Sequence, residues 1–261
     1  MKTTDAIGIF DSGLGGLSVY KEIKALLPNE NIIYFGDTKR APYGSKDKTT
    51  LKQYAIEIIN FLLSHDVKTI VIGCNTINAN LKDDLVNIFD IPFIEIIEPG
   101  IVEALNRTQN GRIGVIATRG TINSGIFEKK LTLVNPDIKV YSKACPLLAP
   151  MVEEGFVEKN ISYLVVDMYL NDIKYKDIDT LILGCTHYPM LEDSIRASMQ
   201  SVSIVNPAYN TALALKEFLA KNDILNNSEV NFHKFYASGD TDNFDKLCYK
   251  FIGEKINSIQ V

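Results

Sequence analysis

The strongest constraint on the fold is a regular alternation of short β-rich runs with longer amphipathic segments. Several runs are apolar almost throughout, which is typical of parallel strands that are covered on both faces. Between the runs, apolar residues recur at three- and four-residue steps, both over residues 51–62 and at Ile161, Leu164, Val165 and Met168. This alternation predicts a doubly wound α/β fold. The expected strands are AIGIF, NIIYF, TIVIG, PFIEII, RIGVIA, IKVYS, TLILG, VSIVN and HKFYAS.

Two pairs of these runs are similar to one another. TIVIGCNT at 69–76 resembles TLILGCTH at 180–187, and IGIFDSG at 7–13 faintly matches IGVIATR at 113–119. The offsets, 111 and 106 positions, are nearly equal. The general similarity of buried parallel strands explains the apolar residues, but not a Gly-Cys-polar-polar ending in both copies. The pattern favours two related α/β units.

Composition limits the classes of partner. Hydrophobic residues make up 46% of the 261 residues, so the chain can bury a sizeable core. Its net charge is -5 and it has no Lys/Arg run, which argues against nucleic acid as a partner. A small anionic ligand is still compatible with this charge, because the backbone amides at a helix N-terminus can bind an anion. No apolar run approaches the roughly 18 residues of a membrane span. The N-terminus has no secretory pattern, so we expect no membrane partner and a cytoplasmic, cytosolic protein.

The four cysteines are expected to be reduced in that compartment. Their wide spacing, without a CxxC pair, argues against a zinc ribbon or a thioredoxin-type motif. Cys74 and Cys185 each follow a predicted strand, at the sheet edge where open α/β sheets bind ligands. Two such units facing each other would place the two thiols on opposite walls of one cleft. A nearby helix N-terminus would raise the thiolate fraction above that of free cysteine.

Two facing thiols suit proton transfer at a carbon atom. One thiolate removes a proton from one face of a Cα, and the opposite thiol delivers a proton to the other face, so that the centre inverts. The developing carbanion needs electrostatic stabilisation and exclusion of water.

Two glycine-containing turns accompany the cysteines. DSGLGG at 11–16 does not have the GxGxxG spacing, which weakens a dinucleotide-binding interpretation. Its backbone amides could bind a carboxylate, while Asp11 binds an ammonium group or directs the proton of a thiol. An equally good interpretation is purely structural, with Asp11 capping the next helix. APYGS at 41–45 offers backbone amides and an aromatic lid.

The remaining cysteines and histidines have simpler interpretations. Neither Cys145 nor Cys248 ends a strand beside polar partners, so both are expected to be buried apolar residues. His65 and His233 have no other candidate catalytic or metal-binding residues near them in the sequence. His187 could pair with a thiolate, protonate a substrate or cap a helix.

These motifs, taken in order along the chain, resemble those of glutamate racemase, a cofactor-independent family that makes D-glutamate for bacterial peptidoglycan. The resemblance spans nearly the whole chain. DSGLGG together with PYG separates it from aspartate and hydantoin racemases. The matching stretches are GIFDSGLGGLSV, YFGDTKRAPYGSK, IGCNT, IIEPG, IGVIATRGTI, ACPLLAPMVEEG and LGCTHYPML.

The resemblance implies interconversion of L- and D-glutamate by two catalytic thiols, Cys74 and Cys185, with Asp11 and His187 in support. It implies no cofactor and no metal, a small-molecule substrate, and a possible homodimer. Two αβα domains would face each other across a cleft, residues 1–98 with 208–261 forming the first and 99–207 the second. The substrate-binding residues it implies are Asp11, Ser12, Tyr43, Gly44, Asn75, Thr76, Thr118, Thr121, Thr186 and His187.

Other positions match or depart from the family pattern. Asp37 and Glu153 match acidic residues near the family's site. Ile77–Asn78 stand where the family often has Ala-Ser, and Asn206–Ala212 replaces an Asp-Ser-Gly-like stretch. We expect amides and hydroxyls, rather than a buried Arg40 or Arg119, to hold the γ-carboxylate of the substrate.

Three other functions stay open at this stage. Cys185 and His187 could form a Cys-His hydrolase or amidotransferase, although this leaves Cys74 unexplained. The lobes could form a hinged, non-catalytic amino-acid binding module. Finally, Cys74, Cys185 and His187 could ligate a metal, since three protein ligands suffice for a catalytic zinc.

Overall fold

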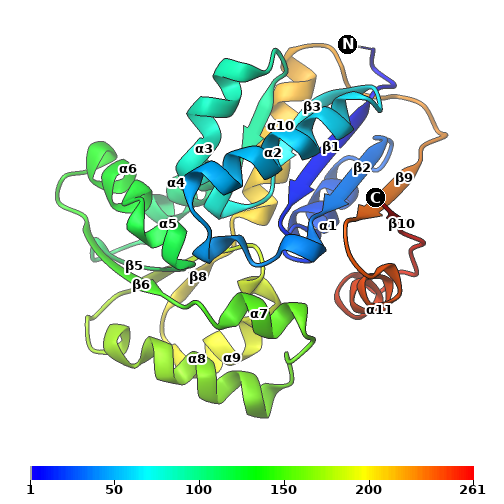
Figure 1. Ribbon diagram of the computed structural model, residues 1–261. Coiled ribbons are helices and arrows are strands. Elements are labelled where there is room, and N and C mark those ends of the chain that lie inside the picture. The colour runs from blue at the N-terminus through cyan, green and yellow to red at the C-terminus, as the bar shows by residue number, and fades with distance from the viewer. Residues whose placement is uncertain (1) are drawn as a thin grey trace.

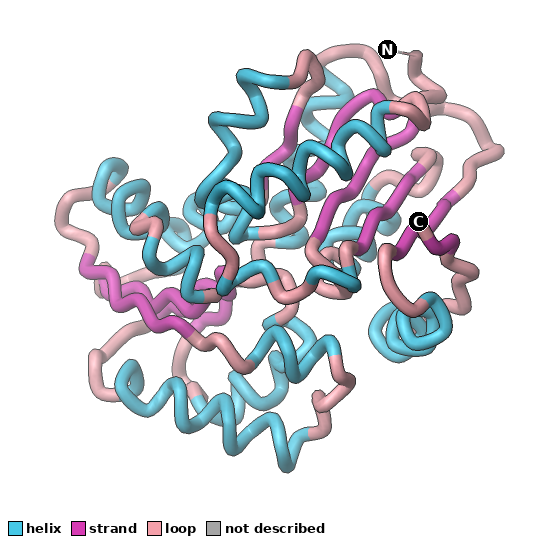
Figure 2. Tube along the Cα trace, in the orientation of Figure 1, coloured by secondary structure: helices cyan, strands magenta, loops and turns pink. Residues whose placement is uncertain are grey.

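The computed structural model describes residues 2–261 and consists of two lobes, each built on a parallel sheet (Figures 1 and 2). The larger sheet has the strand order β10-β9-β2-β1-β3-β4 and the smaller one β6-β5-β7-β8. Every strand pair in both sheets is parallel. The α/β fold expected from the alternating pattern and the two units expected from the repeated runs are therefore confirmed.

The first lobe combines the N-terminal part of the chain with its C-terminal part. Its strands are β1 (Ala6–Asp11), β2 (Ile32–Gly36), β3 (Val67–Ile72), β4 (Phe93–Glu95), β9 (His233–Ala237) and β10 (Ile259–Gln260). Its helices are α1 (Leu17–Leu26), η1 (Thr38–Arg40), η2 (Tyr43–Ser45), α2 (Lys48–Leu63), α3 (Asn75–Ile88), α10 (Ala208–Lys221) and α11 (Thr241–Ile252).

The second lobe lies between these two parts in the sequence. Its strands are β5 (Arg112–Ala117), β6 (Lys139–Ala144), β7 (Thr180–Gly184) and β8 (Ser203–Val205). Its helices are α4 (Ile97–Arg107), α5 (Arg119–Asn123), α6 (Ile126–Val134), α7 (Leu148–Glu153), α8 (Lys159–Lys174), η3 (Tyr188–Leu191) and α9 (Glu192–Ser198). We propose that the domain boundaries fall at 98/99, within the first turn of α4, and at 207/208, directly before α10.

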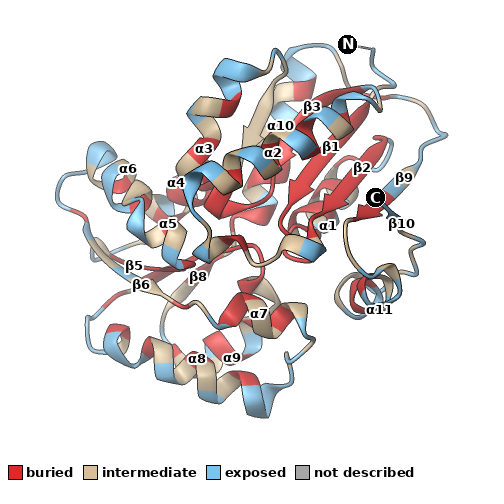
Figure 3. Ribbon diagram, in the orientation of Figure 1, coloured by how far each residue is buried: buried red, intermediate tan, exposed pale blue. Residues whose placement is uncertain are grey.

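The central strands are buried on both faces, as their apolar sequences require (Figure 3). In β1, Ile7 and Ile9 pack into the core formed with α1 and α10, whereas Ala6 and Phe10 point into the core under α2. This alternation follows from the two-residue period of a strand. The core around Ile7 and Ile9 continues into the second lobe beneath α4, so one hydrophobic cluster joins both lobes.

The two lobes repeat one topology. The order β2-β1-β3-β4 in the first sheet corresponds to β6-β5-β7-β8 in the second, with the strands taken in the same sequence order. The similar runs TIVIG and TLILG are therefore β3 and β7, and both occupy the same position in their sheets. This agreement supports the two related units inferred from the sequence.

Some of the sequence predictions need correction. The expected strand PFIEII is shorter, because Ile96 and Ile97 begin α4, and β10 was not predicted. In α8 the predicted apolar face was wrong: Ile161, Leu164 and Met168 are 49%, 70% and 58% exposed.

The buried face of α8 is formed instead by Ser162, Val166, Leu170 and Ile173. The Ser162 hydroxyl is hydrogen-bonded to Ser194 of α9 at 2.7 Å, so a polar residue can occupy a core position. Since α8 carries apolar residues on two sides, periodicity could not select the packed face. Within residues 2–261, every helix falls short of the length and apolar character needed to cross a bilayer.

A buried ion pair fixes the start of β3, the strand that leads to Cys74. Lys68 Nζ lies 2.5 Å from Glu30 Oε2, and both side chains are at most 1% exposed. The same ammonium group donates hydrogen bonds to the carbonyls of Thr3 and Ile224. We predict that Glu30→Gln lowers the free energy of unfolding by about 3–5 kcal/mol, because the buried Lys68 charge loses its counter-charge.

Urea unfolding measures this effect. The double variant Glu30→Gln/Lys68→Met should recover part of the loss. Lys24→Met provides the control, because Lys24 and Glu254 form an exposed pair worth less than about 1 kcal/mol. Equal effects from the buried and the exposed substitutions would contradict the prediction.

Candidate active site

The two thiols occupy equivalent places in the two lobes. Cys74 follows β3 and Gly73 and is the N-cap residue of α3. Cys185 follows β7 directly and precedes η3. Both therefore lie at the carboxyl ends of strands that neighbour the central strands β1 and β5. This is the edge where parallel α/β sheets bind their ligands.

One cavity between the lobes brings these residues together. Its volume is about 10 Å³, close to the space that one water molecule needs. Pro42 and Ala149 also line it and were not singled out in the sequence. The predicted residues that line it are Ser12, Tyr43, Gly44, Cys74, Asn75, Thr76, Thr118, Cys185, Thr186 and His187.

Asp11 lies behind the cavity wall and is completely buried. Its Oδ2 accepts a hydrogen bond from Thr186 Oγ1 at 3.0 Å, and its Oδ1 accepts one from the Gly13 amide at 2.9 Å. Burial raises the pKa of the Asp11 carboxyl, although the nearby His187 opposes this. Asp11 does not cap α1, whose N-cap residue is Gly16 without a side-chain bond. Its contact with Thr186 joins the two lobes.

Thr121 also lies outside the cavity lining, within a cluster of hydroxyl groups. Thr118 Oγ1 is 2.9 Å from Thr76 Oγ1 and 3.1 Å from Thr121 Oγ1. Thr76 belongs to α3 of the first lobe, whereas Thr118 and Thr121 belong to the second. The cluster therefore holds the lobes together beside the cavity and positions two of its lining hydroxyls.

The protonation of Cys74 differs from the sequence-based expectation. Burial and the nearby Asp11 raise the pKa of its thiol to about 12, despite opposing hydrogen bonds from the Ile77 amide and Ser12. The expected gain in thiolate from the helix N-terminus is therefore wrong for Cys74 in this closed arrangement. Desolvation outweighs the helix, so Cys74 is a neutral thiol at pH 7.

His187 stands beside the other thiol. Its Nδ1 lies 3.6 Å from Cys185 Sγ, and its Nε2 lies 2.5 Å from Glu153 Oε1. Burial alone would lower the pKa of His187, but its bonds to Cys185 and Glu153 and the charge of Glu153 raise it well above its usual value. His187 is therefore an imidazolium at neutral pH, so a cation lies next to Cys185.

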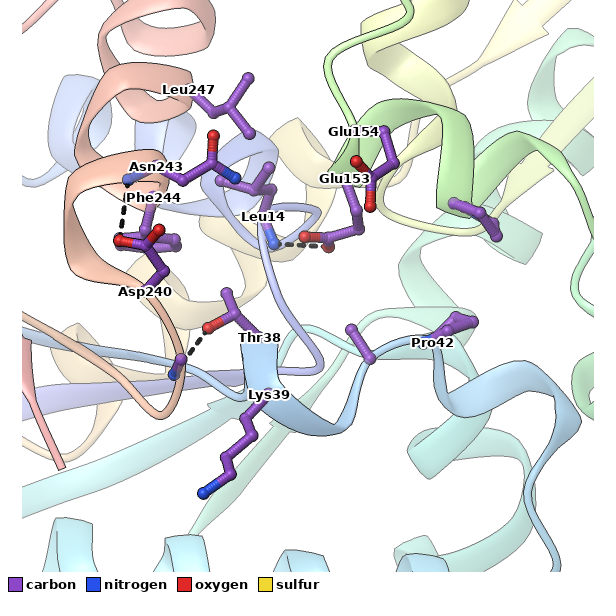
Figure 4. A pocket seen from close by; sticks show the side chains of 13 residues that line it. Leu14, Thr38, Lys39, Pro42, Glu153, Glu154, Asp240, Asn243, Phe244 and Leu247 are labelled. Carbon is purple, nitrogen blue, oxygen red and sulfur yellow. Dashed lines mark hydrogen bonds between the residues drawn. The ribbon is translucent and has the colours of Figure 1, made fainter.

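Glu153, the last residue of α7, connects this histidine to the glycine-rich turn of the other lobe. Glu153 Oε1 also accepts a hydrogen bond from the Leu14 amide at 2.9 Å (Figure 4). The sequence allowed the Gly13 and Leu14 amides, as part of the glycine-rich turn, to take a substrate carboxylate. They are instead bonded to the protein's own carboxylates, Asp11 and Glu153.

The glycines of the two turns permit this close approach of the lobes. A Cβ at Gly15 would lie 2.5 Å from His187 Nδ1 and from Thr186 Oγ1, and one at Gly44 would lie 2.4 Å from Thr118 Cβ. Real Cβ atoms do not approach other atoms so closely. DSGLGG and PYG thus share one physical requirement, which is backbone contact with the opposite lobe.

Asp37 holds the Tyr43 turn in place. The Tyr43 hydroxyl donates to Asp37 Oδ2, which also accepts from Arg40 Nε at 2.7 Å. Ser238, which follows β9, donates to Asp37 Oδ1 at 2.6 Å. Arg40 is engaged by this carboxylate and by Glu57, and neither it nor Arg119 lines the cavity.

A second cavity of about 420 Å³ is lined by Glu153 and by Pro42, which also lines the thiol cavity (Figure 4). Leu14, Thr38 and α11 form its other walls. None of the predicted site residues lines it apart from Glu153. It is a neighbour of the thiol-lined cavity and not a part of it.

The remaining cysteines and histidines lie elsewhere. Cys145 and Cys248 are fully buried and line neither cavity. His65 bonds to the Phe61 carbonyl, and His233 is hydrogen-bonded to Tyr20. Within residues 2–261, no three His, Cys, Asp or Glu side chains are grouped as a metal site would require.

Comparisons with known proteins agree with this geometry. A sequence model of the Asp/Glu/Hydantoin racemase family matches residues 7–214. The chain belongs to this family and is an isomerase of the racemase type. A glutamate racemase of Thermoanaerobacter sp. is 42% identical, with 97% of this chain and 95% of the relative covered.

Solved structures give the same result. A glutamate racemase of Bacillus anthracis has a TM-score of 0.95 and 37% identity, covering 99% of this chain and 98% of that one. A glutamate racemase of Francisella tularensis, solved in complex with D-glutamate, has a TM-score of 0.92 and 38% identity, covering 99% of this chain and 97% of that one. The resemblance seen in the sequence is confirmed.

We predict that His187 is doubly protonated at pH 7.5, whereas His233, whose pKa is lowered by burial, is neutral. Nitrogen-15 NMR of the imidazole rings distinguishes the two states. Since the Glu153 carboxylate raises the pKa of His187, Glu153→Gln should lower that pKa and leave the His233 signals unchanged. A neutral His187 in the unmodified protein at pH 7.5 would contradict this assignment.

Proposed function

We propose that this chain interconverts L- and D-glutamate by proton transfer at Cα, with Cys74 and Cys185 as the two proton carriers. The observation that carries the proposal is that thiols from two lobes line one cavity. Proton transfer to either face of a carbon requires a group on each side within contact distance. The choice of glutamate rests on the glutamate racemases that match the chain over nearly its whole length.

The surroundings of the two thiols suggest their starting roles. The neutral Cys74 thiol has a proton to deliver. Cys185 lies beside the His187 imidazolium and is assigned the role of the base. After one turnover the protons are exchanged, and the reverse reaction uses the thiols in opposite roles. Asp11 and His187 are therefore assigned supporting roles through charge.

Amide and hydroxyl groups would hold the substrate. Asn75 is 2% exposed, and neither its Oδ1 nor its Nδ2 has a hydrogen-bond partner among residues 2–261. A buried amide without partners is costly unless a ligand satisfies it. Its position at the start of α3, beside the Thr76 hydroxyl, suits an anionic carboxylate, because helix N-terminal amides attract negative charge. Ser12, Tyr43, Gly44, Thr118 and Thr186 would complete the binding site.

Closure of the lobes would accompany catalysis. A cavity of about 10 Å³ is too small for an amino acid, so the lobes must part to admit it. On reclosing, the Tyr43 turn and the glycine-rich turn would exclude water from the carbanion. Binding therefore requires breaking and remaking the Asp11–Thr186 and Glu153–Leu14 contacts.

The cellular role follows from the resemblance to glutamate racemases. We propose a cytosolic enzyme that needs no cofactor, supplies D-glutamate for peptidoglycan synthesis and forms a homodimer.

A second candidate is hydrolysis or amide transfer through an acyl-thioester. The Cys185–His187–Glu153 arrangement favours it, since a histidine beside the thiol and a carboxylate beside that histidine resemble a catalytic triad. It assigns no role to Cys74. Trapping an acyl group on Cys185 would support this alternative.

Racemisation is tested by incubating L-glutamate with the protein in D₂O without added cofactor. We expect optical activity to disappear while deuterium enters at Cα. Cys74→Ala and Cys185→Ala should each slow racemisation by roughly 100- to 10,000-fold, because each removes one proton carrier. Cys248→Ala is the matched control and should retain activity. Normal racemisation by Cys74→Ala would rule out the two-thiol mechanism.

A further inference from the structure

Asn78, one of the two residues that depart from the family pattern after Cys74, is buried against the turn that carries this thiol. It is the fourth residue of α3 and is 5% exposed. Its Nδ2 donates hydrogen bonds to the Ile72 carbonyl at 2.7 Å and to the Cys74 carbonyl at 3.1 Å. One side-chain amide therefore spans the whole turn, from the last residue of β3 to the thiol-bearing residue.

The chemistry of the contacts fixes the orientation of this amide. Both partners are carbonyl oxygens, so only the NH₂ end of Asn78 can serve them. Its Oδ1 is buried and finds no partner in the part of the chain that the structure describes, which carries a free-energy cost. The geometry at the turn is thus maintained at the expense of an unsatisfied acceptor on the same side chain.

The turn needs such support because its middle residue has no side chain. A Cβ at Gly73 would lie 3.3 Å from the Phe10 carbonyl and 3.6 Å from Asp11 Oδ2, so the backbone passes close to β1. On that side, the Gly73 amide donates to Phe10 O at 2.8 Å. On the other side, the Asn78 amide holds the carbonyls on either side of Gly73.

We propose that Asn78 is a positioning residue that sets the location of the Cys74 thiol for proton transfer. The proposal rests on the proposed function, since it requires Cys74 to be a proton carrier. It assigns to Asn78 an effect on one of the two thiols only, because neither of its donated bonds reaches the second lobe.

The two thiols allow a test that separates this role from a general loss of stability. Asn78→Ala removes both hydrogen bonds, whereas Asn78→Ser keeps a hydroxyl that can donate to the carbonyl four residues earlier. Asn226→Ala is the matched control: Asn226 is also 5% exposed and donates to a backbone carbonyl, that of Asn29, away from the site.

We expect Asn78→Ala to lower kcat by roughly 10- to 100-fold in both directions, with KM changed less than about threefold, because a misplaced thiol slows proton transfer without removing substrate contacts. The deuterium isotope effect should rise for the Cα-deuterated enantiomer whose proton Cys74 removes, and should fall towards one for the other. Asn78→Ser should recover most of kcat. Isotope effects that change equally for both enantiomers, or an Asn78→Ala variant that behaves like Asn226→Ala, would overturn the proposal.

A second measurement does not depend on racemisation. The rate at which iodoacetamide alkylates each cysteine can be followed by peptide mass spectrometry as a function of pH. In Asn78→Ala the pH profile for Cys74 should shift and that for Cys185 should stay unchanged; unchanged profiles for both would refute the positioning role. If the unmodified protein failed to racemise glutamate, the proposed function would fail, and a shift confined to Cys74 would still show that Asn78 controls this thiol.

Discussion

The closed arrangement depends on carboxylates that bridge the two lobes. Glu153 of the second lobe accepts from the Leu14 amide of the first and pairs with His187 of its own lobe. Asp11 of the first lobe accepts from Thr186 of the second. Each carboxylate lies in a buried or nearly buried setting, where such bonds are stronger than in water. The same contacts that join the lobes therefore also set the charges around the two thiols.

These bridges make a symmetric scaffold electrostatically asymmetric. The sheets repeat one topology, and the two cysteines occupy equivalent strand ends. However, burial and the neighbouring Asp11 disfavour the thiolate of Cys74, whereas Cys185 lies next to the His187 imidazolium. A racemase must meet a substrate centre from both sides, but it must begin each turnover with one thiol protonated and the other ready to accept. In the proposed mechanism, this asymmetry makes Cys74 the proton donor in the closed arrangement.

The two glycine-containing turns, DSGLGG and PYG, also contribute to the contact between the lobes. Gly15 and Gly44 lie where side chains from the opposite lobe leave no room for a Cβ. Their role in closure explains why the turns carry glycine even though the Gly13 and Leu14 amides are occupied by Asp11 and Glu153. In the proposed function, opening must break these contacts, and closure over the bound substrate forms them again.

Much of this protein was determined by sequence alone. Strand periodicity and the repeated Gly-Cys ending predicted two parallel α/β lobes and placed both thiols at strand ends, because these features are local and the edge of a parallel sheet gathers them. Tertiary structure decided the rest. The packed face of α8 depended on which side met Ser194, since apolar residues stood on both. The protonation of Cys74 depended on burial and on Asp11, 63 positions away in the chain. The contacts of Glu153 and Asn78 depended on which backbone groups lay within reach, and no spacing in the sequence records such distances.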